Sequence, residues 1–225
     1  NDSIAEELGI KPGFFLLRIN GEDVDDVIDY EQLTAETHVT LELETKSGKI
    51  VTAEVDKEEY EPLGIYFESG LMSKVRSCKN KCVFCFIDQM PKGGRDTLHF
   101  KDDDWRLSLI MGNYVSLTNV DDKEFDRILR RRVSPLYVSI HATDGAVRTR
   151  MMANPSAARI MERLTALKEH GLCFHGQIVV CPGLNDRDVL KKSLNDLYAL
   201  RPATKTLALV PVGITKFREG LYPLR

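Results

Sequence analysis

The stretch that decides the fold is residues 157–180, which read AARIMERLTALKEHGLCFHGQIVV. Residues 157–170 are expected to form a helix, because Gly171 follows at the place where a helix cap belongs. Residues 174–180 are expected to form a strand. A helix that runs directly into a strand, repeated along the chain, predicts parallel strands joined in βαβ units.

The same alternation extends from residue 69 to residue 225. Further strands are expected at 107–111, 136–140 and 207–210, and further helices at 122–132 and 188–200. Four such repeats predict an α/β fold, an incomplete barrel of strands and helices. In barrels of this kind the functional groups lie at the carboxyl ends of the strands, so residues 112–113, 139–141 and 181–185 are expected to face one opening.

Residues 1–68 are expected to form a separate, small α+β domain. Helices are predicted at 3–8 and from residue 26 to 33, and a strand at 14–19 that closes in the turn Asn20-Gly21. Apolar and polar residues alternate in 39–44 and in 50–55, and a turn joins the two stretches, which predicts a hairpin. Residues 63–67 are expected to form a short strand that closes the domain.

Composition and charge exclude several classes of protein. The 225 residues are 43% hydrophobic and 29% charged, which is typical of a globular protein with a real core. The sequence has no apolar run near the roughly 20 residues that cross a bilayer and no signal peptide, so a cytoplasmic protein without a membrane partner is expected. The formal charge of −3 argues against a nucleic-acid partner, and residues 130–132, three arginines, are interpreted as a solvated helix end.

Three of the five cysteines lie within eight residues. Cys78, Cys82 and Cys85 form a C-x3-C-x2-C pattern, whereas a disulfide framework would need an even, distributed set. Three thiolates on one loop can hold three irons of a cubane cluster and leave the fourth iron open, while an electron-transfer cluster normally has four protein thiolates. Zinc, with His99 or another residue as the fourth ligand, is the alternative, although structural zinc loops usually pair cysteines in C-x2-C units. Cys173 and Cys181 are interpreted as small buried hydrophobic residues.

This spacing, with Phe84 just before the last cysteine, resembles the signature of the radical S-adenosylmethionine (SAM) enzymes. The stretches 82–89, 101–108, 112–119, 139–143 and 177–183 extend the likeness to an uncharacterised bacterial family. Its members join a PDZ-like segment, a radical-SAM core and a C-terminal domain of unknown function. The likeness covers nearly the whole chain and implies that the chain stops inside a longer protein.

Residues 5–13, which run into residues 17–21, resemble the PDZ domains of bacteria. The strand that usually opens such a domain is absent, so a domain cut at its N-terminus is expected. PDZ domains bind peptide ends beside a sheet edge, and residues 63–67 look like the binding loop and strand. The simpler interpretation, in which these residues only close the domain, is preferred, and a peptide or protein partner remains a secondary prediction.

The radical-SAM likeness implies a cofactor set and its ligands. Cys78, Cys82 and Cys85 would hold a [4Fe-4S] cluster, SAM would occupy the open iron, and Phe84 would lie near the adenine. An electron from a donor such as a flavodoxin or ferredoxin would cleave SAM to methionine and a 5′-deoxyadenosyl radical, and the protein would set orientation and exclude water. No catalytic residue is named.

The Gly-Gly-Glu that usually binds the amino group of SAM is missing. Its substitutes are expected to be Gly112 with Asn113 or Thr118 with Asn119. Three further candidates for SAM binding lie on or after strands: Ser139, His141 and Gln177. His141 could instead be a core histidine, and residues 102–104, three aspartates, are interpreted as a solvated or helix-capping turn rather than an acid–base pair.

Two other functions stay open at this point. Because the Gly-Gly-Glu is missing, the chain could be a peptide-binding scaffold with a structural or redox-sensing iron–sulfur cluster. Simple electron transfer is the third hypothesis, and it would require a fourth protein ligand to the cluster.

Overall fold

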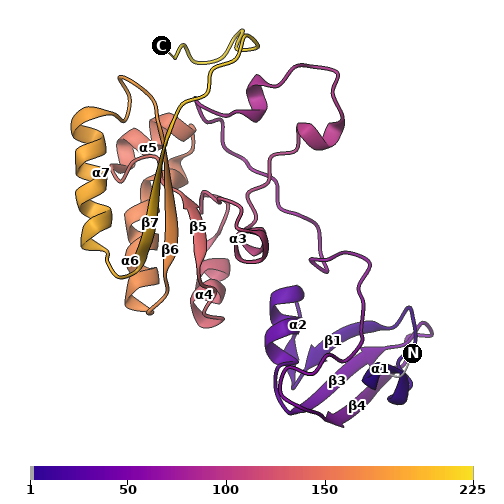
Figure 1. Cartoon of the computed structure of the whole chain (residues 1–225). Helices are drawn as coiled ribbons and strands as arrows, with labels where there is room; N and C mark the ends of the chain where they lie inside the picture. The colour runs from indigo at the N-terminus through magenta and orange to yellow at the C-terminus, as the bar shows by residue number, and fades with distance from the viewer. Residues whose placement is uncertain (1–2, 225) are drawn as a thin grey trace. The chain divides into compact units, whose positions relative to one another are not determined.

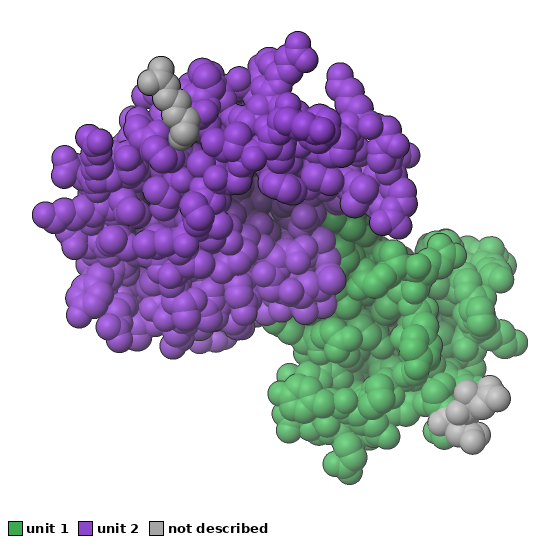
Figure 2. All heavy atoms as spheres, turned by 45° about the horizontal axis from the view of Figure 1, so that its top comes forward, with its two compact units in different colours: residues 1–75 green, residues 76–225 purple. Residues whose placement is uncertain are grey.

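The computed structural model describes residues 3–224 and divides the chain into two compact units. Unit 1 is residues 1–75 and unit 2 is residues 76–225 (Figures 1 and 2). The boundary that the sequence predicted, after residue 68, falls within unit 1.

Unit 1 is a four-stranded antiparallel sheet with two short helices. In chain order it contains α1 (Ile4–Glu7), β1 (Phe15–Ile19), β2 (Glu22–Asp23), α2 (Val27–Leu33), β3 (His38–Glu44) and β4 (Ile50–Asp56). The strands lie in the order β2-β1-β3-β4. Side-chain caps begin both helices, because Ser3 Oγ accepts from Glu6 N and Asp26 Oδ1 accepts from Ile28 N. The predicted helices, the strand at 15–19 and the hairpin are confirmed.

The prediction of a strand at 63–67 is wrong. These residues are irregular, and Gly64 has φ of +78°, which breaks an extended backbone. Leu63 nevertheless packs into the core of unit 1 with Ile19, Val39 and Leu41, and its carbonyl accepts from Ala5 N (2.8 Å). The segment therefore closes the core as a loop, and the likeness of unit 1 to PDZ domains stays a prediction.

Unit 2 contains a three-stranded parallel sheet with helices around it (Figure 1). The strands β5 (Leu136–Ser139), β6 (Phe174–Val180) and β7 (Thr204–Pro211) lie in that order. The helices that follow the predicted positions are α4 (Asp122–Arg130), α6 (Ile160–Glu169) and α7 (Arg187–Ala199), and a 3-10 helix, η3 (Pro155–Arg159), forms the start of the predicted helix at 157–170. The sequence analysis missed α5 (Gly145–Met152). No helix among residues 3–224 has the length and apolar character that a membrane span needs.

The prediction of a strand at 107–111 is also wrong, since these residues belong to helix α3 (Trp105–Met111). Asp104 caps its first turn by accepting from Arg106 N (3.1 Å), and Gly112 ends it with a left-handed backbone. The strand-like segment comes later, where Val115 makes an isolated parallel bridge to Val138 of β5. The described part of unit 2 is therefore a mixed α/β structure, and the predicted barrel is not confirmed.

Candidate functional site

The loop from Cys78 to Cys85, called the cysteine loop below, is fixed by backbone hydrogen bonds at its start and in its middle. Cys78 N donates to Lys101 O (2.7 Å). Lys81 N and Val83 N donate to the carbonyls of Met152 (3.0 Å) and Met151 (2.8 Å), which lie at the end of α5. The loop thus begins beside residue 101, and its middle lies against the C-terminal turn of α5.

An apolar layer separates this loop from the interior. Cys82, Val83 and Phe84 pack against a buried cluster that includes Met151, Met152 and Cys181. Cys181 is buried as predicted, and it lies in the layer against which the cysteine loop packs. The prediction was wrong for Cys173, which is only half-buried and lies beside Ser134 Oγ (3.1 Å from its Sγ).

The three loop thiols are free and half-buried. Burial raises the pKa of all three, most strongly that of Cys82, and the neighbouring thiolates of Cys78 and Cys85 raise the Cys82 pKa further. A bound cation reverses this effect, because it stabilises the thiolate form. Uncharged thiols are therefore favoured until a cationic group binds to the loop.

Among residues 3–224, no group of three or more His, Cys, Asp or Glu side chains could hold a single metal ion. Thiolates that each bind a different iron of a cluster stand farther apart than ligands of one ion. His99, the predicted fourth ligand of the zinc alternative, is exposed.

Within the loop, Asn80 is the centre of a buried polar network. Its Nδ2 donates to Ser116 Oγ (3.0 Å), and its Oδ1 accepts from Thr118 Oγ1 (2.9 Å) and from Asn154 Nδ2 (2.7 Å). A buried amide with three partners is held in one orientation. Asn80 therefore ties the loop to residues 115–117, called the Val115 segment below, to Thr118 after that segment, and to Asn154, two residues after the end of α5.

The acidic turn at residues 102–104 is not solvated as predicted, because Asp103 and Asp104 are buried. Asp103 accepts from Ser116 N (2.6 Å), Ser116 Oγ (2.5 Å) and Asn119 Nδ2 (2.8 Å), while burial raises its pKa. Asp104 caps α3 and pairs with Arg106 (2.6 Å), which confirms the helix-capping interpretation.

The two predicted substitutes for Gly-Gly-Glu lie in different places. Thr118 and Asn119 follow the Val115 segment and reach the cysteine loop, since Asn119 Nδ2 donates to Ser77 O (3.2 Å) and Thr118 bonds to Asn80. Gly112 ends α3 beside the Tyr137 ring, and Asn113 Nδ2 donates to Asp102 Oδ2 (2.9 Å). Only the first pair is bonded directly to the Ser77–Asn80 part of the chain.

A hollow of about 460 Å³ opens beside Thr118 and Asn119. Lys79 of the cysteine loop and Asn154 also line this hollow, which is called the Asn119 pocket below. Asn119 Oδ1 is buried and accepts no hydrogen bond from any residue in the described range 3–224. A buried acceptor without a donor is costly, so this atom is a place for a donor from a ligand.

His141 faces the cysteine loop from the end of β5. Its ring lies 4.2 Å from the Phe84 ring, centroid to centroid, and its Nδ1 accepts from Val179 N (3.2 Å). Burial, with a smaller contribution from Arg148, lowers the pKa of His141 to about 3, so the ring is neutral at pH 7. Its backbone φ of +63° is strained for a residue with a side chain, and Asn185 Nδ2 stabilises it by donating to His141 O (2.6 Å).

Ser139 and Gln177 lie opposite each other on β5 and β6. Both are half-buried and share the sheet face opposite to that of Val138 and Ile178, which are buried. Gln177 O accepts from Ile140 N (2.8 Å), so its main chain holds the end of β5. No described hydrogen bond joins the side chain of Ser139 or Gln177 to the cysteine loop.

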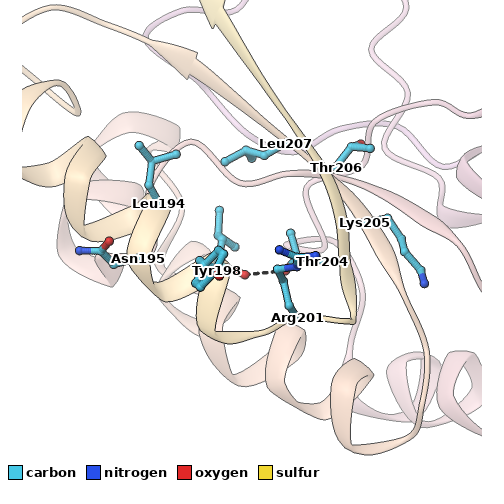
Figure 3. A pocket seen from close by; sticks show the side chains of 9 residues that line it. Leu194, Asn195, Tyr198, Arg201, Thr204, Lys205, Thr206 and Leu207 are labelled. Atoms are coloured by element: carbon cyan, nitrogen blue, oxygen red, sulfur yellow. Dashed lines mark hydrogen bonds between the residues drawn. The ribbon is translucent and has the colours of Figure 1, made fainter.

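A larger hollow, of about 550 Å³, lies elsewhere in unit 2 (Figure 3). It is formed by the end of α7, with Tyr198 and Arg201, and by the start of β7, with Thr204 and Leu207. This is the amino end of the parallel sheet, opposite to the end that carries His141. None of the predicted site residues lines it, so we place the candidate site at the cysteine loop on chemical grounds rather than on size.

The family model described as Radical SAM-like domain matches residues 57–207, about two thirds of the chain. The chain belongs to the Radical SAM-like domain family. No curated protein was found to match it. A crystal structure of a radical SAM methyltransferase from Sphaerobacter thermophilus is similar at 16% identity, with a TM-score of 0.41, over 98% of this chain and 72% of that one.

Membership of the Radical SAM-like domain family implies a [4Fe-4S] cluster and SAM, and the described residues fit both groups. The donor set of three free thiols on one loop suits a cluster with one open iron. The unpartnered Asn119 Oδ1 suits a ligand with an N–H group, such as an amino acid moiety.

Sequence reasoning missed several residues that shape the site of this Radical SAM-like domain. Gln89 is fully buried and bonds to Cys85 O (3.1 Å) and Gly213 O (3.3 Å), while Thr215 N donates to its Oε1 (3.1 Å). Arg148, on the helix that was not predicted, is buried among backbone carbonyls. The position of Asn80 inside the cysteine loop could have identified it as a site residue. The residues next to Arg148 in the sequence give no such indication.

Proposed function

We propose that this protein is a radical enzyme that cleaves SAM reductively, with Cys78, Cys82 and Cys85 as the ligands of a [4Fe-4S] cluster. When bound, this cluster and SAM supply one-electron cleavage of the sulfonium to methionine and a 5′-deoxyadenosyl radical. The observation that carries the proposal is the match to the Radical SAM-like domain family over the range that contains all three cysteines.

The Asn119 pocket is our candidate for the amino acid end of SAM. Asn119 Oδ1 is free to accept from an ammonium group, and Asn119 Nδ2 is held by Asp103 Oδ2 and Ser77 O, which fixes the amide orientation. Lys79 brings a positive charge to the same hollow, suited to a carboxylate. Thr118 and Asn119 thus take the part that Gly-Gly-Glu plays in related enzymes.

Phe84 and His141 are our candidates for the adenosyl end. Their rings are in contact, and the loop packs behind them against an apolar layer. His141 is neutral at pH 7 and its Nδ1 is already an acceptor, so its Nε2–H is the group left to donate to a ligand.

The experiment is anaerobic reconstitution of the whole chain with iron and sulfide, followed by electron paramagnetic resonance with and without SAM. We expect the spectrum of the reduced cluster to change when SAM is added, and 5′-deoxyadenosine to form with dithionite or a reduced flavodoxin. Alanine variants of Cys78, Cys82 and Cys85 should each lose both signals, while Cys173→Ala, outside the loop, should keep them. A cluster-loaded, reduced sample whose spectrum ignores SAM would refute the proposal in favour of electron transfer.

Calorimetry separates the scaffold hypothesis from the proposed function. A radical enzyme should bind SAM with an affinity that falls when Cys82→Ala removes the cluster. Tight binding of C-terminal peptides by a chain that shows no SAM affinity would instead identify a scaffold.

A further inference from the structure

Arg148 of α5 is a buried cation whose hydrogen bonds all go to backbone carbonyls. It is 1% exposed, and its Nε donates to Ile140 O (2.8 Å). Nη1 donates to Ala157 O (2.8 Å), and Nη2 donates to Ser116 O (2.7 Å) and Ser139 O (2.8 Å). One side chain therefore joins the Val115 segment, the end of β5 and η3.

No carboxylate among residues 3–224 lies within ion-pair distance of this guanidinium. Burial lowers the pKa of Arg148 to about 10, which still leaves it charged at pH 7. The helix that carries Arg148 is bonded to the cysteine loop on either side of Cys82, because Lys81 N and Val83 N donate to Met152 O and Met151 O of α5. Negative charge on Cys82, and to a smaller extent on Asp103, stabilises the charged form of Arg148. A buried charge without a direct counter-ion is expensive and is retained where it balances another charge.

We infer that Arg148 is a positioning residue of the cysteine site, which holds the end of β5 and places a permanent positive charge on the helix against which Cys82 packs. This inference rests on the proposed function, because the charge that Arg148 balances is that of the thiolate-bound cluster. Carbonyls at the strand ends partly neutralise the guanidinium by hydrogen bonding but carry no net charge. The positive charge therefore remains to act on the site.

Two substitutions separate the effect of the Arg148 charge from the effect of its hydrogen bonds. Reduction adds one electron to the cluster, and a nearby positive charge favours the reduced form, so removing it should make reduction harder. Arg148→Gln removes the charge and most of the hydrogen bonds. Arg148→Lys keeps the charge but loses the fork of donors that reaches four carbonyls.

The test is a redox titration of the reconstituted whole chain, without SAM, followed by electron paramagnetic resonance. In Arg148→Gln we expect the ratio of reduced to oxidised cluster at a fixed potential to fall about tenfold, which corresponds to about 59 mV for one electron. Arg148→Lys should titrate close to the wild type although its thermal stability falls. Arg127→Gln is the matched control, because it also removes a buried arginine, but from α4, and its titration should match the wild type.

Other results of the titration either support or overturn the role of the charge. Equal potentials for Arg148→Lys and Arg148→Gln would overturn it, whether or not both are destabilised. If Arg148→Gln takes up no cluster, the iron content per chain is measured in place of the reduction potential. Cluster uptake by Arg148→Lys then supports a role of the positive charge. Equal loss of iron in both variants overturns the inference. Failure of the wild type to take up a cluster would be a failure of the proposed function and is read separately.

Discussion

The ring of Phe84, inside the cysteine loop, lies 4.2 Å from the ring of His141, which follows β5. The two residues are 57 positions apart in the sequence, and their contact joins the loop to the end of the parallel sheet. Because Val179 N donates to His141 Nδ1, the histidine ring is oriented from β6 as well. The contact therefore sets Phe84, the residue before the last cysteine, against a neutral imidazole with a fixed orientation.

His141 should make the stability of the apo protein depend on pH. Its pKa is about 3 in the folded chain and about 6.5 when unfolded, so the unfolded state binds the proton between these values. The free energy of unfolding should therefore fall as pH decreases from 6.5, by up to about 1.4 kcal/mol per pH unit from this residue. Urea denaturation at several pH values, with His141→Asn as the non-titrating control, measures the difference. Parallel profiles for the two proteins would contradict the prediction.

Asn80 should be required for the shape of the cysteine loop. Asn80→Ala takes away the acceptor of Asn154 Nδ2 and one of the partners of Thr118 Oγ1, which also bonds to Ser116 Oγ, and an unsatisfied buried group costs about 1–3 kcal/mol. We expect a lower free energy of unfolding of the apo protein and less iron per chain after reconstitution. Lys81→Ala, an exposed position in the same loop, is the control and should change neither quantity. Wild-type stability and iron content in Asn80→Ala would show that the network is dispensable.

The buried pair of Asp104 and Arg106 should stabilise helix α3. Asp104→Ala removes the helix cap and one carboxylate partner of the buried Arg106 guanidinium, so we expect a loss of about 1–3 kcal/mol in urea denaturation. The double variant Asp104→Ala with Arg106→Leu should recover part of that loss, because it also removes the buried charge that Asp104 helped to neutralise. A double variant as unstable as the sum of the two single variants would mean that the residues act independently.

Gln89 should hold the segment at residues 213–218 next to the cysteine loop. Its amide bonds to Gly213 O and Thr215 N, so Gln89→Ala should release this segment. Trypsin should then cut faster at Lys216 and Arg218, which limited proteolysis with mass spectrometry detects. Gln89→Glu keeps the acceptor for Thr215 N, so its rate of cleavage should lie between those of the wild type and Gln89→Ala. Cleavage at the wild-type rate in Gln89→Ala would argue that other contacts hold the segment.

Much of unit 2 could be predicted because its signals are local. The strand at Phe174–Val180 and the helix ended before Gly171 follow from composition and caps within a few residues. The error at α3 has the same origin: a run of seven residues, WRLSLIM, is too short for its period to separate a helix from a buried strand. Asp104 before it and Gly112 after it were usable helix signals.

The site divides in the same way. The sequence alone determined the three thiols and their spacing, because eight consecutive residues supply them whatever surrounds the loop. Only the tertiary structure decided that Thr118 and Asn119, rather than Gly112 and Asn113, bond to that part of the chain, and that Arg148 is buried among the backbone carbonyls of separate segments. Arg148 meets carbonyls as far apart in the sequence as those of Ser116 and Ala157. Contacts of that kind depend on how separate segments pack, and backbone carbonyls carry no signature in the amino-acid sequence.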